Sequence, residues 1–206
     1  MIDKKGLLIV ISGPSAVGKG TICKELIKRN IENLEISISA TTRKPRYNEV
    51  NGVNYHFISK ETFESMVQQG EFLEYAQVYD NYYGTPKKYV IDRLSEGKDV
   101  ILEIDIQGAK QVRENYKEGI FIFIMPPSYK ELKNRIMKRG TEAQKDIEKR
   151  MKCAYEEIKQ AEYYNYIVVN DDLYSAVEKI YCIITAEKCK LNRYHIDLSE
   201  FKEELL

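Results

Sequence analysis

The chain has 206 residues, of which 43% are hydrophobic and 31% charged, proportions typical of one globular domain with a substantial core. Its 32 basic residues balance 32 acidic ones, so the overall charge points neither to nucleic acid nor to an anionic membrane. Scattered cysteines without a Cys-x-x-Cys pair, and only two histidines, argue against a zinc site and favour reduced thiols. No apolar run approaches membrane-spanning length, so we expect a soluble cytoplasmic protein.

The first predicted elements are a buried strand at residues 7–11 and a helix that begins near Lys19, joined by a glycine-rich loop. The spacing of Gly13, Gly18 and Lys19 is that of a phosphate-binding loop, in which backbone N–H groups and a lysine hold phosphate oxygens. An ordinary glycine-rich turn is the alternative. The common pattern has serine or threonine directly after the lysine, whereas here Gly20 precedes Thr21. Because one residue turns a side chain by about 100° around a helix, we expect Thr21 to reach Mg²⁺ through water.

Between residues 35 and 85 the pattern predicts short strands, turns and one helix. We expect strands at residues 35–40, 55–58 and 72–78, a helix at residues 60–69 capped by Ser59, and a turn at residues 80–84. We expect Thr85 to cap the following helix, with Pro86 in its first position. This region therefore reads as a small module inserted into a larger core.

The remaining pattern alternates buried strands with helices. Strands are expected at residues 100–104, 120–125 and 166–169, with helices between them and a closing helix at residues 173–189. A cap at Thr141 begins the helix that follows the break at Gly140. This alternation predicts an α/β fold with a doubly wound, mostly parallel five-stranded sheet. Ligands bind at the carboxyl ends of such strands, which here are expected at Ser12, Ala40, Asp105, Pro126 and Asn170.

A basic loop interrupts this charge-balanced chain at Arg43 and Arg46, which flank Pro45. Arginine forks match phosphate oxygens bidentately. The hydroxyls of Tyr55 and Tyr83 lie beside turns and are able to donate to the same anion. A solvated basic loop with half-buried tyrosines is the alternative interpretation.

A second group of arginines lies on two helices joined by a short hinge. Arg135 and Arg139 lie four apart on one helix, and Arg150 lies on the next one, after Gly140. Such an arrangement is typical of a lid that closes over a ligand. Salt-bridged surface helices are the alternative, since glutamates lie nearby in the sequence.

Several segments together resemble the guanylate kinases, a family of P-loop nucleoside monophosphate kinases. The likeness runs from about residue 7 to residue 191 and is carried by the loop that ends Gly-Lys-Gly-Thr and by these segments: residues 37–57, 71–76, 81–85, 103–108, 139–142 and 169–172. Two departures stand out. Asn48 stands where many members have glycine, and asparagine can still adopt the left-handed backbone conformation of a turn. Residues 143–145 are less acidic than in many members.

The resemblance implies an enzyme that phosphorylates GMP to GDP with ATP and Mg²⁺, without a nucleic acid or membrane partner. ATP would be held by the loop, Gly13, Pro14, Ser15, Ala16, Val17, Gly18, Lys19, Gly20 and Thr21, and by Asn170. The catalytic residues would be Lys19, Arg43, Arg135, Arg139 and Arg150. The phosphate of GMP would be held by Arg43, Arg46, Tyr55 and Tyr83, and its guanine by Ser39, Glu74, Thr85 and Asp105. Glu103 ends a buried strand, where it is placed to orient a water on Mg²⁺ beside Thr21.

The resemblance also implies a division of the chain. The GMP-binding insertion would span residues 39–85, the lid residues 135–150, and the core residues 1–38, 86–134 and 151–206. Two alternatives stay open: a related P-loop kinase that acts on AMP or a sugar phosphate, and a non-catalytic guanylate-kinase-like module that binds phosphopeptides. The sequence leaves the oligomeric state open.

Overall fold

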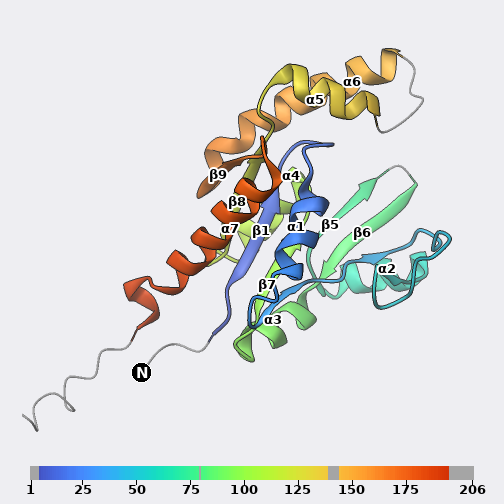
Figure 1. The fold of residues 1–206 in the computed structure, drawn as a ribbon. Helices are drawn as coiled ribbons and strands as arrows, with labels where there is room; N and C mark the ends of the chain where they lie inside the picture. The colour runs from blue at the N-terminus through green and yellow to red at the C-terminus, as the bar shows by residue number, and fades with distance from the viewer. Residues whose placement is uncertain (1–4, 79, 139–143, 195–206) are drawn as a thin grey trace, which may run out of the picture.

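A computed structural model of the chain describes residues 5–78, 80–138 and 144–194, with residues 144–146 described by their backbone. Its centre is a parallel sheet in which the described strands follow the order β2-β7-β1-β8-β9 (Figure 1). These strands are β1 (Leu8–Ser12), β2 (Leu34–Ile36), β7 (Asp99–Glu103), β8 (Ile120–Met125) and β9 (Tyr166–Val169). The predicted doubly wound five-stranded sheet is confirmed.

Helices cover both faces of this sheet. α1 (Lys19–Lys28) and α7 (Leu173–Lys188) pack against one face, and α3 (Lys87–Ser95) and α4 (Ile106–Asn115) pack against the other. α5 (Tyr129–Lys138) and α6 (Gln144–Lys159) run side by side above the carboxyl ends of the strands (Figure 1). Short 3₁₀ helices follow at Gln160–Tyr163 and Leu191–Arg193. Across the described ranges, no helix combines the length and apolarity needed to cross a membrane.

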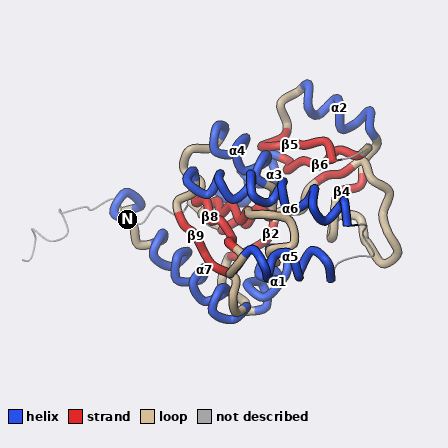
Figure 2. The backbone as a smooth tube through the Cα atoms, turned by 90° about the horizontal axis from the view of Figure 1, so that it is seen from above, coloured by secondary structure: helices blue, strands red, loops and turns tan. Residues whose placement is uncertain are grey.

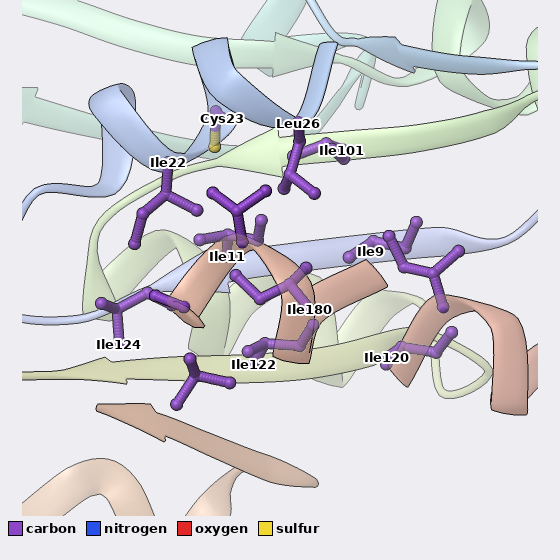
Figure 3. Close-up of a cluster of buried hydrophobic side chains, with 14 of the residues drawn as sticks. Ile9, Ile11, Ile22, Cys23, Leu26, Ile101, Ile120, Ile122, Ile124 and Ile180 are labelled. Carbon is purple, nitrogen blue, oxygen red and sulfur yellow. The ribbon is translucent and has the colours of Figure 1, made fainter. Parts of the chain in front are cut away.

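The core explains why β1 reads as an uninterrupted apolar run. Ile9 and Ile11 pack into the cluster beneath α1 and α7 (Figure 3), whereas Leu8 and Val10 pack against α3 and α4. A strand covered on both faces needs apolar residues at every position rather than at alternate ones. Each such side chain contributes about 1.5–3 kcal/mol by burial, and this rigid strand carries the loop that follows it.

A second, smaller sheet lies to one side, with strand order β4-β3-β6-β5 (Figure 2). Its strands are β3 (Ala40–Thr41), β4 (His56–Phe57), β5 (Phe72–Val78) and β6 (Asn81–Pro86), and α2 (Lys60–Gln68) packs on it. Ser59 caps α2 as predicted, by accepting the Thr62 N–H. Phe63 on α2 is fully buried and stacks on the rings of Phe72 and Tyr82.

Several local predictions between residues 35 and 86 are wrong, because tertiary pairing decides the outcome. The strand expected at residues 35–40 is divided between the two sheets: Leu34–Ile36 pairs with β7, and Ala40–Thr41 pairs with β4 and β6. Ala40 therefore ends no strand of the main sheet.

The turn expected at residues 80–84 is largely strand, because Asn81–Pro86 pairs with β5. Thr85 is consequently part of β6 and caps no helix, and Pro86 takes the N-cap position of α3. The predicted cap at Thr141 lies outside the described residues.

Candidate active site

The loop at residues 13–18, here called the phosphate loop, has a backbone conformation that demands its glycines. Gly13 and Gly18 have φ of +148° and +102°, a range that side-chain-bearing residues rarely adopt. A Cβ at Gly13 would lie 2.4 Å from the carbonyl oxygen of Ile124, and one at Gly18 would lie 2.6 Å from Nδ2 of Asn170. Conformation and space thus exclude larger residues at both positions. The loop ends at the N-terminus of α1, where N–H groups and the helix dipole attract anions.

Lys19 bends back over this loop. Its Nζ donates to the carbonyl oxygen of Gly13 at 2.6 Å and to that of Pro14 at 3.2 Å. The ammonium group is therefore held against the backbone of the loop, beside the amides that suit phosphate oxygens.

Two of the predicted lid arginines reach the phosphate loop. Arg135 on α5 donates to the carbonyl oxygens of Val17 at 3.3 Å and of Asn170 at 3.0 Å. Arg150 on α6 donates to Oγ of Ser15 at 2.9 Å. Asn170, which follows β9, donates to the Val17 carbonyl oxygen at 2.8 Å. The third predicted arginine, Arg139, lies outside the described residues.

The carboxylate of Glu103 faces the first turn of α1. A Cβ at Gly20 would lie 3.1 and 3.3 Å from the two oxygens of Glu103, so glycine at this position leaves room for that carboxylate. Thr21 follows directly and is exposed. Carboxylate and hydroxyl oxygens suit Mg²⁺, which is usually bound by one or two carboxylates together with phosphates and waters. Within the described ranges no group of three or more His, Cys, Asp or Glu side chains is arranged to hold a metal ion alone.

The basic loop contains an internal ion pair. Both terminal nitrogens of Arg43 donate to the carboxylate of Glu49 at 2.9 Å, and the backbone N–H of Arg46 donates to the same carboxylate at 2.7 Å. The Arg43 guanidinium, followed by the Arg46 amide, lowers the pKa of Glu49 to about 2. Asn48 has φ of +70°, so the expected left-handed conformation at this position is confirmed. A carboxylate thus occupies the arginine fork that was predicted to hold a phosphate.

Aromatic residues surround this arginine. The Arg43 guanidinium lies 5.5 Å from the ring centre of Tyr55 and 5.8 Å from that of Phe57. The rings of Tyr55 and Tyr83 approach edge to face at 6.0 Å, and burial raises the pKa of Tyr55. The structure therefore gathers Arg43, Tyr55 and Tyr83, whereas Arg46 is exposed nearby.

Glu74 is a buried acidic residue of the second sheet. Its side chain is only 6% exposed, and its Oε1 accepts the Thr85 hydroxyl at 2.6 Å across the β5–β6 pair. Burial raises the pKa of Glu74 to about 7, with the nearby Asp105 carboxylate as a further cause. Asp105 caps α4 by accepting the Gly108 N–H at 2.8 Å.

Glu74, Thr85 and Asp105 therefore meet where the second sheet borders α4. A Cβ at Gly108 would lie 2.7 Å from the free oxygen of Glu74 and 3.4 Å from Oδ1 of Asp105. Ser39 lies at the entrance to β3, where its carbonyl oxygen accepts the His56 N–H at 2.9 Å. A side chain at position 108 would crowd both carboxylates, so this position needs glycine.

Sequence reasoning missed the roles of two glutamates. Glu49 fills the Arg43 fork, and Glu157 on α6 accepts the Ser15 N–H at 3.4 Å. Glu157 lies seven residues, or two helical turns, after Arg150, so both face the phosphate loop. The spacing places Glu157 on the same helix face as Arg150, but it does not reveal the contact with Ser15.

A parallel sheet, a glycine-rich loop that ends at the N-terminus of a helix, and arginines of two further helices that contact this loop together define a P-loop phosphotransferase. A family model described as guanylate kinase matches residues 5–187. The chain belongs to the guanylate kinase family, as its sequence motifs predict.

Individual relatives agree with this family. The chain is 59% identical over 206 residues to a guanylate kinase from Clostridioides difficile, with 100% of each covered. It is 60% identical over 192 residues to a guanylate kinase from Caldanaerobacter subterraneus, with 93% of each covered. A crystal structure of guanylate kinase from Anaplasma phagocytophilum superposes with a TM-score of 0.75 at 34% identity, covering 94% of this chain and 92% of that one.

Proposed function

We propose that this chain transfers the γ-phosphoryl group of ATP to GMP, giving ADP and GDP. Membership of the guanylate kinase family supports this activity. The observation that carries the choice of acceptor is the buried carboxylate of Glu74, with Thr85 bound to one oxygen and Asp105 close by.

In this proposal, Glu74 and Asp105 read the guanine base. Guanine presents N1–H and N2–H₂ as donors, which an ionised carboxylate accepts. Adenine would turn an unprotonated N1 toward the same carboxylate and leave buried groups unpaired, which is how large discrimination arises. Thr85 fixes the orientation of the Glu74 carboxylate, and Ser39 completes the site at the start of β3.

Arg43, Arg46, Tyr55 and Tyr83 would hold the phosphate of GMP. The ion pair with Glu49 orients the Arg43 guanidinium before the acceptor arrives, because two parallel hydrogen bonds fix its plane. The rings of Tyr55 and Phe57 lie beside the guanidinium and limit its movement. A preoriented arginine loses less side-chain entropy when the phosphate binds.

On the donor side, the phosphate-loop amides and Lys19 would hold the β- and γ-phosphates of ATP. Arg135, Arg139 and Arg150 would add positive charge from the lid, and Asn170 would lie beside the adenine. Glu103 and Thr21 offer the oxygen ligands that suit Mg²⁺, through water, at the first turn of α1. When bound, Mg²⁺ neutralises charge on the phosphates.

The chemistry itself requires no general base. A phosphate monoester has a second pKa near ~6, so the attacking oxygen of GMP is largely ionised at neutral pH. The task of the protein is to bring two polyanions into line and to stabilise charge that spreads over the transferred group. We propose that residues 39–85 form the GMP-binding insertion and residues 135–150 the lid, and that their closure over the core excludes water. The cytoplasmic location stays a prediction.

A coupled spectrophotometric assay tests the activity. ATP is supplied with GMP, dGMP, AMP or a sugar phosphate in turn, and Lys24→Ala, which changes an exposed residue of α1, serves as the control variant. We expect turnover with guanine nucleotides and a loss of at least ~10³-fold with AMP. Equal rates with AMP and GMP would point to the related kinase. No turnover, together with calorimetric binding of a phosphopeptide, would point to the non-catalytic module.

A further inference from the structure

The helix α6 contacts the phosphate loop at Ser15 in two places. The Glu157 carboxylate accepts the backbone N–H of Ser15 at 3.4 Å, and Arg150 donates to the Ser15 hydroxyl at 2.9 Å. The backbone and the side chain of one loop residue are thus bound by two charged side chains from the same face of one helix.

Ala16, the next residue of the loop, makes apolar contacts with α5 and α6. Ala16 is 7% exposed and packs into a cluster formed by α5 and α6, whose other members are Leu132, Ile136, Ile147, Met151 and Ala154. Ala16 has φ of +66°, a left-handed conformation that a side-chain-bearing residue keeps only when its surroundings enforce it. α5 and α6 therefore hold the tip of the loop in a strained conformation.

Lys19 holds the same loop from α1. Its Nζ bonds to the carbonyl oxygens of Gly13 and Pro14. The loop is therefore held from two sides, by the first residue of the helix that follows it and by the charged side chains of α6.

We propose that Glu157 is a positioning residue of the ATP site, which acts through the Ser15 amide to hold the phosphate loop in its binding conformation. This inference rests on the proposed function, since it takes ATP as the ligand of the loop. Glu157 touches neither nucleotide in this account; it preorganises the amides that do.

The electrostatic surroundings of Glu157 fit this role. The carboxylate is half-buried, and burial raises its pKa, while the Ser15 amide and the charge of Lys19 act in the opposite direction. The Asp105 carboxylate is a further charge that acts on it. A carboxylate so close to a polyanion site would repel the ligand unless donors offset its charge. The Ser15 N–H and Lys19 provide this offset.

Calorimetric binding of Mg·ATP in the absence of GMP tests the proposal with two complementary variants. Glu157→Asp keeps the charge but withdraws the carboxylate from Ser15, and we expect its Kd for ATP to rise about tenfold, since hydrogen bonds to charged groups are worth about this much. Glu157→Gln keeps an acceptor oxygen at full length, and we expect its Kd to stay within about twofold of the parent. Glu156→Gln, which changes an exposed neighbour paired with Lys159, is the matched control. We expect the Kd for GMP to be unchanged in all of these variants.

Either of two results would overturn the inference. One is unchanged ATP binding by Glu157→Asp. The other is binding by Glu157→Gln as weak as that by Glu157→Asp, which would show that an acceptor oxygen within reach of the Ser15 amide does not preserve ATP binding. Equal weakening of ATP and GMP would also overturn it, because a general disturbance would then explain the loss. The ATP titration contains no GMP. If the parent protein lacks GMP kinase activity, the proposed function is contradicted, but the titration still tests the role of Glu157 in ATP binding.

Discussion

The substitution Glu74→Gln is expected to stabilise the ligand-free protein above pH 7 while it weakens the binding of GMP. Glutamine has the same shape as glutamate but no charge. It keeps an oxygen that accepts the Thr85 hydroxyl, and its amide group faces Asp105, where a donor is favourable. The ionised carboxylate that it replaces is almost fully buried.

The magnitude follows from the pKa of Glu74, which burial raises from 4.5 to about 7. Each pH unit is worth about 1.4 kcal/mol, so ionising this group in the folded protein costs roughly 3 kcal/mol more than in the unfolded chain. Because the folded-state pKa lies above the unfolded one, the stability linked to protonation of Glu74 is fully present below pH 4.5 and is lost as the pH rises through about 7.

Urea unfolding at pH 5 and pH 8 measures this difference. We expect Glu74→Gln to exceed the parent by about 2–3 kcal/mol in unfolding free energy at pH 8, and by much less at pH 5. The same variant should bind GMP at least ~10²-fold more weakly at pH 8, because the glutamine amide cannot accept both guanine donors. An equal stability difference at both pH values, or a variant less stable than the parent at pH 8, would show that ionised Glu74 does not destabilise the fold.

Three further substitutions test individual parts of the site. Lys19→Ala should lower kcat by about 10²–10³-fold while calorimetry still detects GMP binding, and a variant at the parental rate would show that the phosphate loop is wrongly assigned. Arg43→Ala should weaken GMP by about 10²-fold and leave ATP within twofold, since it removes a charge-assisted fork; equal losses for both nucleotides would contradict separate sites. Gly108→Ala places a methyl group 2.7 Å from the free oxygen of Glu74, so the KM for GMP should rise about tenfold, whereas Lys110→Ala on the exposed face of α4 should leave it unchanged. A parental KM in Gly108→Ala would show that guanine does not approach Glu74 from that side.

Elements with strong local patterns were predictable from the sequence. The strands at Ile120–Met125, Tyr166–Val169 and Phe72–Val78 have the predicted bounds, because apolar runs and flanking turn residues mark both ends. The phosphate loop was predictable for the same reason, since all of its essential residues lie within seven positions of one another.

Elements that depend on distant pairing were not predictable. Residues 81–84 have the composition of a turn, yet they form a strand because β5 pairs with them and Glu74 binds Thr85 across the pair. The contact between Glu157 and Ser15 joins residues 142 positions apart, and no local pattern marks it. The ion pair of Arg43 with Glu49 is local, but loop composition does not distinguish an arginine that awaits a ligand from one that a carboxylate already orients.

The most direct test of the central claim is a crystal structure with GMP and a non-hydrolysable ATP analogue bound together. We predict guanine against Glu74 and Asp105, its phosphate on Arg43 and Arg46, and the analogue's phosphates in the loop at residues 13–18, with the two phosphate chains in line. Guanine bound away from these carboxylates, or both nucleotides bound at a single site, would contradict it.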